Sequence, residues 1–102
     1  MDISELQKIA KKFRDGLNRQ NPKQYNTPVE LLADLTEELG ELAKSITRKE
    51  IRNMGSEHKI EEEVIDVLFS LLWIANHYGL DIEKEIKKSV QKWEKRFGVE
   101  LG

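Results

Sequence analysis

Apolar residues recur every three or four positions along most of this chain, which is the spacing expected of amphipathic helices. Four such stretches are separated by short polar or glycine-containing segments, and they predict helices over residues 3–17, 28–48, 58–77 and 82–97. No stretch alternates in the manner of a half-buried strand, and no internal repeat is visible. We therefore expect a single all-α domain over residues 1–102, built from four helices with short connections.

Local signals support the starts of the second and fourth helices. Thr27 can cap a helix whose first position is Pro28, a residue well suited to that position. Asp81 is a good N-cap for the last helix. Residues 21–27 and 53–56 interrupt the apolar pattern, so we expect loops there.

Composition narrows the class of protein. Charged residues make up 35% of the chain and hydrophobic residues 38%, which suits a folded helical domain with solvated outer faces. No apolar stretch approaches the ~20 residues of a membrane span, and the N-terminal residues do not resemble a signal peptide, so we expect a cytoplasmic protein without membrane contact. The net charge of −2 disfavours a nucleic-acid-binding protein. The absence of cysteine excludes disulfides and thiolate metal sites.

The expected core is small. A single layer of four helices made from 102 residues buries little apolar surface and leaves residues such as Trp73 and Tyr78 poorly covered. We therefore expect the chain to form a homo-oligomer that completes the bundle.

The strongest chemical signal comes from two pairs of carboxylates. Glu38 and Glu41 are three residues apart in the second predicted helix. Glu63 and Asp66 have the same spacing in the third. Residues three apart lie on one side of a helix, so the four carboxylates would meet if the two helices pack side by side. Because ionised carboxylates repel each other unless a cation lies between them, the pattern predicts a divalent metal site.

The donor atoms favour a hard metal ion. Carboxylate oxygens alone suit Mg²⁺, with Mn²⁺ as a second choice. A di-iron bundle would need a histidine three residues after a glutamate on two helices, and neither His58 nor His77 has that position. The simpler alternative is that these acids are only solvated surface residues. Gly40 argues against it, because a glycine in mid-helix costs ~1 kcal/mol relative to alanine and so indicates a close helix contact or a ligand.

Three runs of the sequence carry a resemblance to a known family. They are Leu35-Thr36-Glu37-Glu38-Leu39-Gly40-Glu41-Leu42-Ala43, Glu61-Glu62-Glu63-Val64-Ile65-Asp66-Val67-Leu68 and Ile74-Ala75-Asn76-x-x-Gly79-Leu80-Asp81. The acids form a joint motif, in which two glutamates and a third one turn later are followed, after 21 intervening residues, by a Glu-x-x-Asp pair. Together these runs resemble the signature of the MazG-like nucleoside triphosphate pyrophosphohydrolases over roughly residues 25–97.

The resemblance implies an all-α, Mg²⁺-dependent enzyme that is usually a homodimer or homotetramer. Such enzymes cleave a nucleoside triphosphate between its α and β phosphates and release a nucleoside monophosphate and pyrophosphate. Four positions of this chain match the family's metal ligands: Glu38, Glu41, Glu63 and Asp66. Glu37 matches a position that is often acidic, and we assign it, with Glu38, to catalysis as a residue that orients water.

The last predicted helix departs from the family pattern Lys-x-x-x-Asn-x-x-Arg-Tyr. This chain has Ser89-x-x-x-Trp93-x-x-Arg96-Phe97 in its place. Arg96 matches the family's arginine, and Lys88 or Lys92 can replace the missing lysine, so we expect Arg96 and Lys92 to bind the substrate. Asn76 is a third candidate for substrate binding. Trp93 is expected to pack in the core.

Two alternatives remain beside an enzyme that cleans the nucleotide pool. One is the related phosphoribosyl-ATP pyrophosphohydrolase, which shares the fold and the acids but whose sequences resemble the run from Leu35 to Glu41 less closely. The other is a non-catalytic helical module that binds a nucleotide or a protein. For Trp73, base stacking and an oligomer contact both stay open beside core packing, which we prefer.

Overall fold

Four helices make up the fold in the computed structural model, which describes residues 1–21, 27–52 and 59–102. In chain order they are α1 (Ile3–Gln20), α2 (Pro28–Glu50), α3 (Ile60–His77) and α4 (Ile82–Phe97). Within the described residues there is no strand, and no helix is long and apolar enough to cross a membrane. The predicted all-α fold of four helices is confirmed. Most of the predicted loop 21–27, the loop 53–56 and His58 lie outside the described ranges.

The helix starts follow the capping signals in the sequence. The Thr27 hydroxyl accepts a hydrogen bond from the Glu30 backbone N–H (3.3 Å) and donates one to the Glu30 carboxylate (2.6 Å). The Asp81 carboxylate accepts from the Lys84 backbone N–H at 3.2 Å. Asp2 caps α1 in the same manner, by accepting from a first-turn N–H at 2.8 Å. These bonds satisfy N–H groups that lack a partner inside the helix, so they help to fix where α1, α2 and α4 begin, whereas α3 has no side-chain cap.

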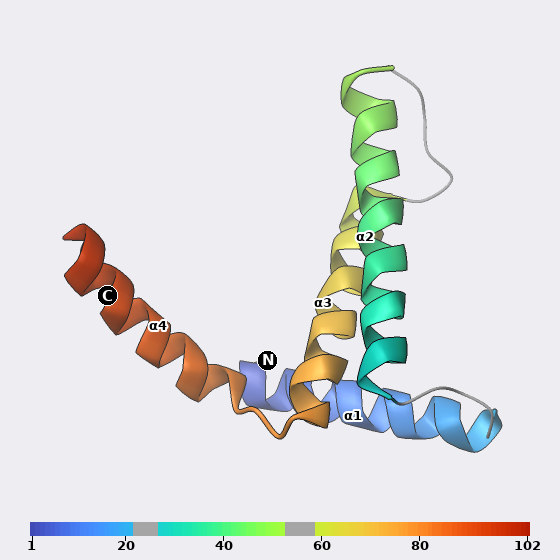
Figure 1. The fold of residues 1–102 in the computed structure, drawn as a ribbon, viewed down its shortest axis with the longest axis horizontal. Helices are drawn as coiled ribbons and strands as arrows, with labels where there is room; N and C mark the ends of the chain where they lie inside the picture. The colour runs from blue at the N-terminus through green and yellow to red at the C-terminus, as the bar shows by residue number, and fades with distance from the viewer. Residues whose placement is uncertain (22–26, 53–58) are drawn as a thin grey trace.

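α2 and α3 lie side by side and run in opposite directions, so they form a helical hairpin (Figure 1). α1 crosses one end of this hairpin, next to the C-terminal part of α3. α4 leaves α3 through a short turn and runs away from the hairpin, and its main contacts are with α1. The hairpin is therefore where the candidate metal ligands of α2 and α3 can meet.

One chain buries few side chains. The buried apolar residues among those described are Ala10, Leu31, Leu72 and Ala75, and none of the described large side chains is fully buried. Several larger residues stay open to solvent, including Leu32 (57% exposed), Leu39 (48%) and Leu71 (48%). No residue of α4 is buried. The expected homo-oligomer, which would cover this surface, stays a prediction.

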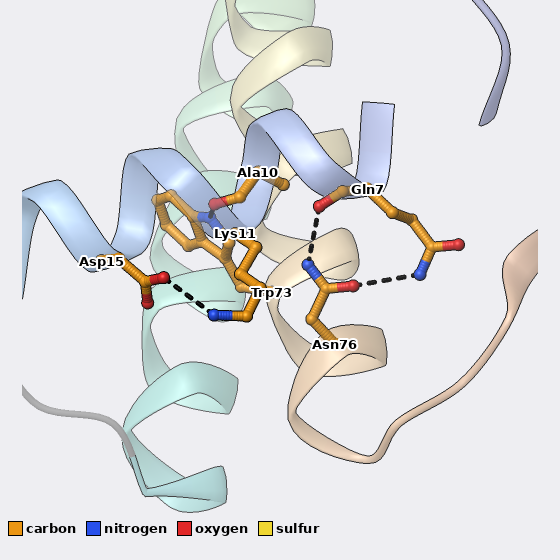
Figure 2. A network of polar contacts seen from close by, with 6 residues as sticks. All are labelled: Gln7, Ala10, Lys11, Asp15, Trp73 and Asn76. Atoms are coloured by element: carbon orange, nitrogen blue, oxygen red, sulfur yellow. Dashed lines mark hydrogen bonds and ion pairs between the residues drawn. The ribbon is translucent and has the colours of Figure 1, made fainter. Parts of the chain in front are cut away.

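Two side-chain amides join α1 to α3 and to the start of α4, and we call them the amide joint (Figure 2). The Gln7 side-chain nitrogen, Nε2, donates to Asn76 Oδ1 (3.0 Å) and to the Leu80 carbonyl (2.9 Å). Asn76 Nδ2 donates to the Gln7 carbonyl (3.0 Å). The Gln7 side-chain oxygen accepts from the backbone N–H of Ile82, the first residue of α4 (3.0 Å). These hydrogen bonds hold the beginning of α4 against α1.

Candidate functional site

Three carboxylates from the hairpin meet between α2 and the N-terminal half of α3. They belong to Glu38 on α2 and to Glu63 and Asp66 on α3, and one oxygen of each lies within 4.8 Å of the others. Glu63 is buried, with 3% of its surface exposed, whereas Glu38 is half-buried and Asp66 is exposed. We call these three residues the acid cluster. Their oxygens are close enough together for one cation to contact all three.

The neighbouring carboxylates change the pKa of Glu38. Burial raises the pKa of the Glu38 carboxyl above its ordinary value, and neighbouring carboxylates raise it further. These neighbours are, in decreasing order of effect, Asp66, Glu63, Glu37 and Glu41. Because all of these contributions have the same sign, the cluster carries an excess of negative charge that a cation would relieve.

This pKa shift predicts how the substitution Glu38→Gln changes the stability of the metal-free protein. The pKa of Glu38 is higher in the folded state than in the unfolded state, so its contribution to stability is lost as the pH rises through the folded-state pKa. We therefore expect Glu38→Gln to raise Tm near neutral pH. Below the ordinary pKa of 4.5 the carboxyl is protonated in both states, so the gain should vanish there.

Thermal unfolding in the presence of EDTA, followed by circular dichroism, measures Tm of the wild-type and Glu38→Gln proteins. It is carried out near neutral pH and below the ordinary pKa of the carboxyl. Glu100→Gln, which removes an exposed carboxylate from the C-terminal end of the chain, is the matched control and should leave Tm almost unchanged at either pH. An equal gain for Glu38→Gln at both pH values would contradict the electrostatic explanation.

The structure does not place the fourth predicted ligand in the acid cluster. Glu41, one turn further along α2, is half-buried, and its oxygens are not among those that meet within 4.8 Å. Its charge nevertheless raises the pKa of Glu38, and so does that of Glu37, which is exposed. The ligand role of Glu41 and the catalytic role of Glu37 stay predictions.

Gly40 has a different environment from the one expected. A Cβ atom added at Gly40 would meet no described atom within 4 Å. A close helix contact within the described part of one chain therefore does not explain this mid-helix glycine, and its explanation by a ligand stays a prediction.

An apolar pocket of about 370 Å³ opens beside the acid cluster, and Glu38 and Asp66 form part of its wall; we call it the aromatic pocket. Its other lining residues come from α1 and α3: Ile9, Phe13, Ile65, Phe69, Ser70 and Trp73. The ring centroid of Phe13 lies 5.6 Å from that of Trp73 and 6.4 Å from that of Phe69. The pocket can accept a flat aromatic group whose polar end extends to the acids. Sequence reasoning missed the contribution of α1, because Ile9 and Phe13 belong to an apolar stripe that is typical of core residues.

Trp73 is both a packing residue and a wall of this pocket. Its indole nitrogen, Nε1, donates to the Ala10 carbonyl at 2.9 Å (Figure 2). The Arg14 guanidinium carbon lies 4.9 Å from the centroid of the ring. These contacts with α1 fix the plane of the indole, so the wall is rigid before any ligand binds.

The three predicted substrate-binding residues belong neither to the acid cluster nor to the lining of the aromatic pocket. Both polar atoms of the Asn76 side chain bond to Gln7 in the amide joint, and Asn76 is not one of the residues that line the aromatic pocket. Lys92 and Arg96 are exposed on α4, and the Arg96 guanidinium lies over the ring of Phe97, 5.3 Å from its centroid. A single chain does not bring these cations to the acid cluster, because α4 runs away from the hairpin (Figure 1).

The expectation that Trp93 packs in the core is wrong for a single chain. It is 45% exposed and so does not pack in the core of one chain. The physical reason is the direction of α4, which leaves the apolar side of this helix without a neighbouring helix along most of its length.

Comparison with known proteins identifies the family of this chain. The profile of the MazG nucleotide pyrophosphohydrolase domain matches residues 26–97. The chain belongs to this family, and the predicted family and the predicted class of enzyme, a pyrophosphohydrolase, are confirmed.

Two relatives illustrate the similarity. YpjD of Bacillus subtilis, a protein without a characterised function, is 30% identical over 97 residues, which are 91% of this chain and 80% of YpjD. The crystal structure of YpjD, described as a candidate pyrophosphatase, superposes with a TM-score of 0.78 at 28% identity and covers 94% of this chain and 96% of its own. A Bacillus-conserved MazG protein, a nucleotide pyrophosphohydrolase, superposes with a TM-score of 0.69 at 31% identity over 91% of this chain and 89% of its own.

Proposed function

We propose that this protein hydrolyses ribo- or deoxyribonucleoside triphosphates between the α and β phosphates, with Mg²⁺ or Mn²⁺ as cofactor, and that it cleans the cytoplasmic nucleotide pool. The products are a nucleoside monophosphate and pyrophosphate. The observation that carries the proposal is the acid cluster in the wall of an aromatic pocket, in a chain of the MazG family. The two features match the two ends of a nucleotide, because one suits a metal-bound phosphate chain and the other a base.

The donor set of the acid cluster fits a hard divalent cation. Its three carboxylates are oxygen ligands within reach of one ion, and Glu63 is buried, where an ionised carboxylate without a nearby cation is costly. Glu38, Glu63 and Asp66 would hold the ion, and Glu41, one turn further along α2, is the fourth predicted ligand. Such an ion, when bound, neutralises phosphate charge and lowers the pKa of a coordinated water.

The residues of the pocket orient the substrate. A base that packs against the aromatic side chains of the wall, Phe13 and Trp73, leaves its sugar and phosphates directed toward Glu38 and Asp66, which line the same pocket. Apart from the acids, Ser70 is the one aliphatic polar residue among the described residues that line the pocket. We therefore expect the base to be selected mainly by shape and stacking.

Two neighbouring carboxylates can prepare the attacking water. Glu37 is exposed beside Glu38 and can accept a hydrogen bond from the water that attacks the α phosphorus. Glu38, as one of the residues that would hold the cation, would keep a coordinated water next to Glu37. Glu38 would thus position the water, and Glu37 would accept its proton.

Product analysis in ¹⁸O-labelled water tests the proposed bond cleavage. Incubation of the wild-type protein with each common triphosphate and Mg²⁺ should yield monophosphate and pyrophosphate, with the label in the monophosphate. Label in pyrophosphate would show attack on the β phosphorus. Release of orthophosphate and a nucleoside diphosphate would contradict the proposed reaction.

A further inference from the structure

The indole of Trp73 separates two pockets. It lines the aromatic pocket, and it also lines a second pocket of about 250 Å³, which we call the rear pocket. Polar side chains of α1 line the rear pocket, among them Lys11, Arg14 and Asp15, and Trp73 is the one described residue that the two linings share. Because open space adjoins the ring in two directions, packing alone does not keep the indole in place as a wall of the aromatic pocket.

Two contacts with α1 hold the ring. The hydrogen bond from Nε1 of Trp73 to the Ala10 carbonyl (2.9 Å) fixes only the edge that carries the nitrogen. The guanidinium carbon of Arg14 lies 4.9 Å from the ring centroid, so this cation covers a face of the indole. A cation over the face of a tryptophan is attracted by the ring, and most strongly where little water screens the contact. Only 11% of the Arg14 side chain is exposed, so the screening is weak.

Arg14 is held in turn by the hairpin. Its Nη1 lies 3.8 Å from a carboxylate oxygen of Asp34 on α2. The Asp34 side chain is 46% exposed, so the ion pair contributes little stability by itself, but it keeps the guanidinium directed across the protein instead of toward solvent. Lys11, another cation in the lining of the rear pocket, pairs instead with Asp15 of its own helix at 2.8 Å (Figure 2). Among the described residues, Arg14 is therefore the cation that braces the ring.

We infer that Arg14 is a positioning residue, which holds Trp73 as the wall between the two pockets and thereby sets how tightly the aromatic pocket binds the base of the substrate. This inference rests on the proposed function. Without the guanidinium, the indole can tilt into the rear pocket, and the loss of its freedom on binding a base then opposes binding. In the wild-type protein the ring is already ordered when the substrate arrives.

The place of Arg14 separates its role from that of the acids. Arg14 belongs neither to the acid cluster nor to the lining of the aromatic pocket, so its loss should leave the chemical step unchanged. It also lies in α1, outside residues 26–97, which match the family profile. The affinity for the base would thus depend on a helix that precedes the matched region.

Steady-state kinetics of Arg14→Met test the inference. Methionine keeps an unbranched apolar stem over the ring but carries no charge. KM for nucleoside triphosphates should rise about tenfold, and kcat should stay within about twofold of the wild type. The inhibition constant of inorganic tripolyphosphate, which has no base, should not change, because the acid cluster is intact. An unchanged KM, or a rise in KM matched by an equal loss of tripolyphosphate binding, would overturn the inference.

Two further variants show whether the charge over the ring is responsible. Arg14→Lys keeps a cation that can lie over the indole, so it should recover part of the lost affinity. Lys11→Met is the matched control, because it removes a charge from the same helix and the same pocket, and it should keep the wild-type KM. An Arg14→Lys protein as impaired as Arg14→Met, or a Lys11→Met protein with the same rise in KM, would contradict the proposed role of Arg14.

Trp73 supplies a readout that does not depend on activity. The chain has two tryptophans, so Trp93→Phe leaves Trp73 as the only one. In that background the near-UV circular dichroism of the indole, which requires a fixed ring, should weaken with Arg14→Met and persist with Lys11→Met, while the far-UV spectrum stays the same. If the wild-type protein hydrolyses no triphosphate, the proposed function fails, and this measurement still decides whether Arg14 fixes the ring. A near-UV signal that Arg14→Met leaves unchanged would refute the inference.

Discussion

Glu63→Gln should lower kcat/KM by at least about 10³-fold, which corresponds to a loss of about 4 kcal/mol of transition-state stabilisation. Glu63 is the most buried member of the acid cluster, so neither a neighbouring side chain nor a water molecule can easily take its place as a ligand. Glutamine has the same shape but lacks the negative charge, and its neutral amide oxygen is a weaker ligand for a divalent cation than a carboxylate. The substitution therefore removes the charge of one ligand without opening a cavity.

Steady-state kinetics with Mg²⁺ measure the loss, and far-UV circular dichroism shows that the helices are retained. Glu50→Gln, at the exposed C-terminal end of α2, is the control and should leave kcat/KM within twofold or so of the wild type. Wild-type turnover by the Glu63→Gln protein would remove the acid cluster from the mechanism.

Chelation should abolish activity completely, and Mg²⁺ or Mn²⁺ should restore it. The residues of the acid cluster are all negative, and so is the phosphate chain, so the two repel each other unless a cation lies between them. The expected effect is a fall in pyrophosphate release to the uncatalysed level after dialysis against EDTA, followed by recovery on titration with either metal.

Direct binding of Mn²⁺ separates the site from the reaction. Isothermal titration should detect Mn²⁺ binding by the wild-type protein and much weaker binding by the Glu63→Gln and Asp66→Asn proteins. Turnover that persists in EDTA would be incompatible with a metal-dependent mechanism, whatever the titration shows.

The helices could be predicted from the sequence because their signals are local. The capping residues Thr27 and Asp81 make the hydrogen bonds that their positions predict. The three-residue spacing of Glu63 and Asp66 places both on one side of α3 in any helix. That Glu38 of α2 lies beside them follows from the hairpin, which short connections between amphipathic helices favour.

The features that were not predicted depend on contacts between distant residues. An apolar stripe shows that one side of a helix will be covered, but not what covers it, and for this reason Trp93 was placed in the core. The aromatic pocket depends on the angle at which α1 crosses α3, which a hydrogen bond between Trp73 and Ala10 helps to fix. The residues next to Phe13 in the sequence do not specify that crossing angle.

The amide joint makes the direction of α4 depend on a side chain of α1. Gln7 bonds to the first residue of α4, 75 positions further along the chain. The same side chain bonds to Leu80 in the turn and to Asn76 on α3, so one amide sets the angle between three helices. A change of this single side chain would swing the far end of a 16-residue helix, about 24 Å long, through a larger arc than any change near that end. Variation in the N-terminal helix can thus alter where α4 points, without touching any residue of the acid cluster.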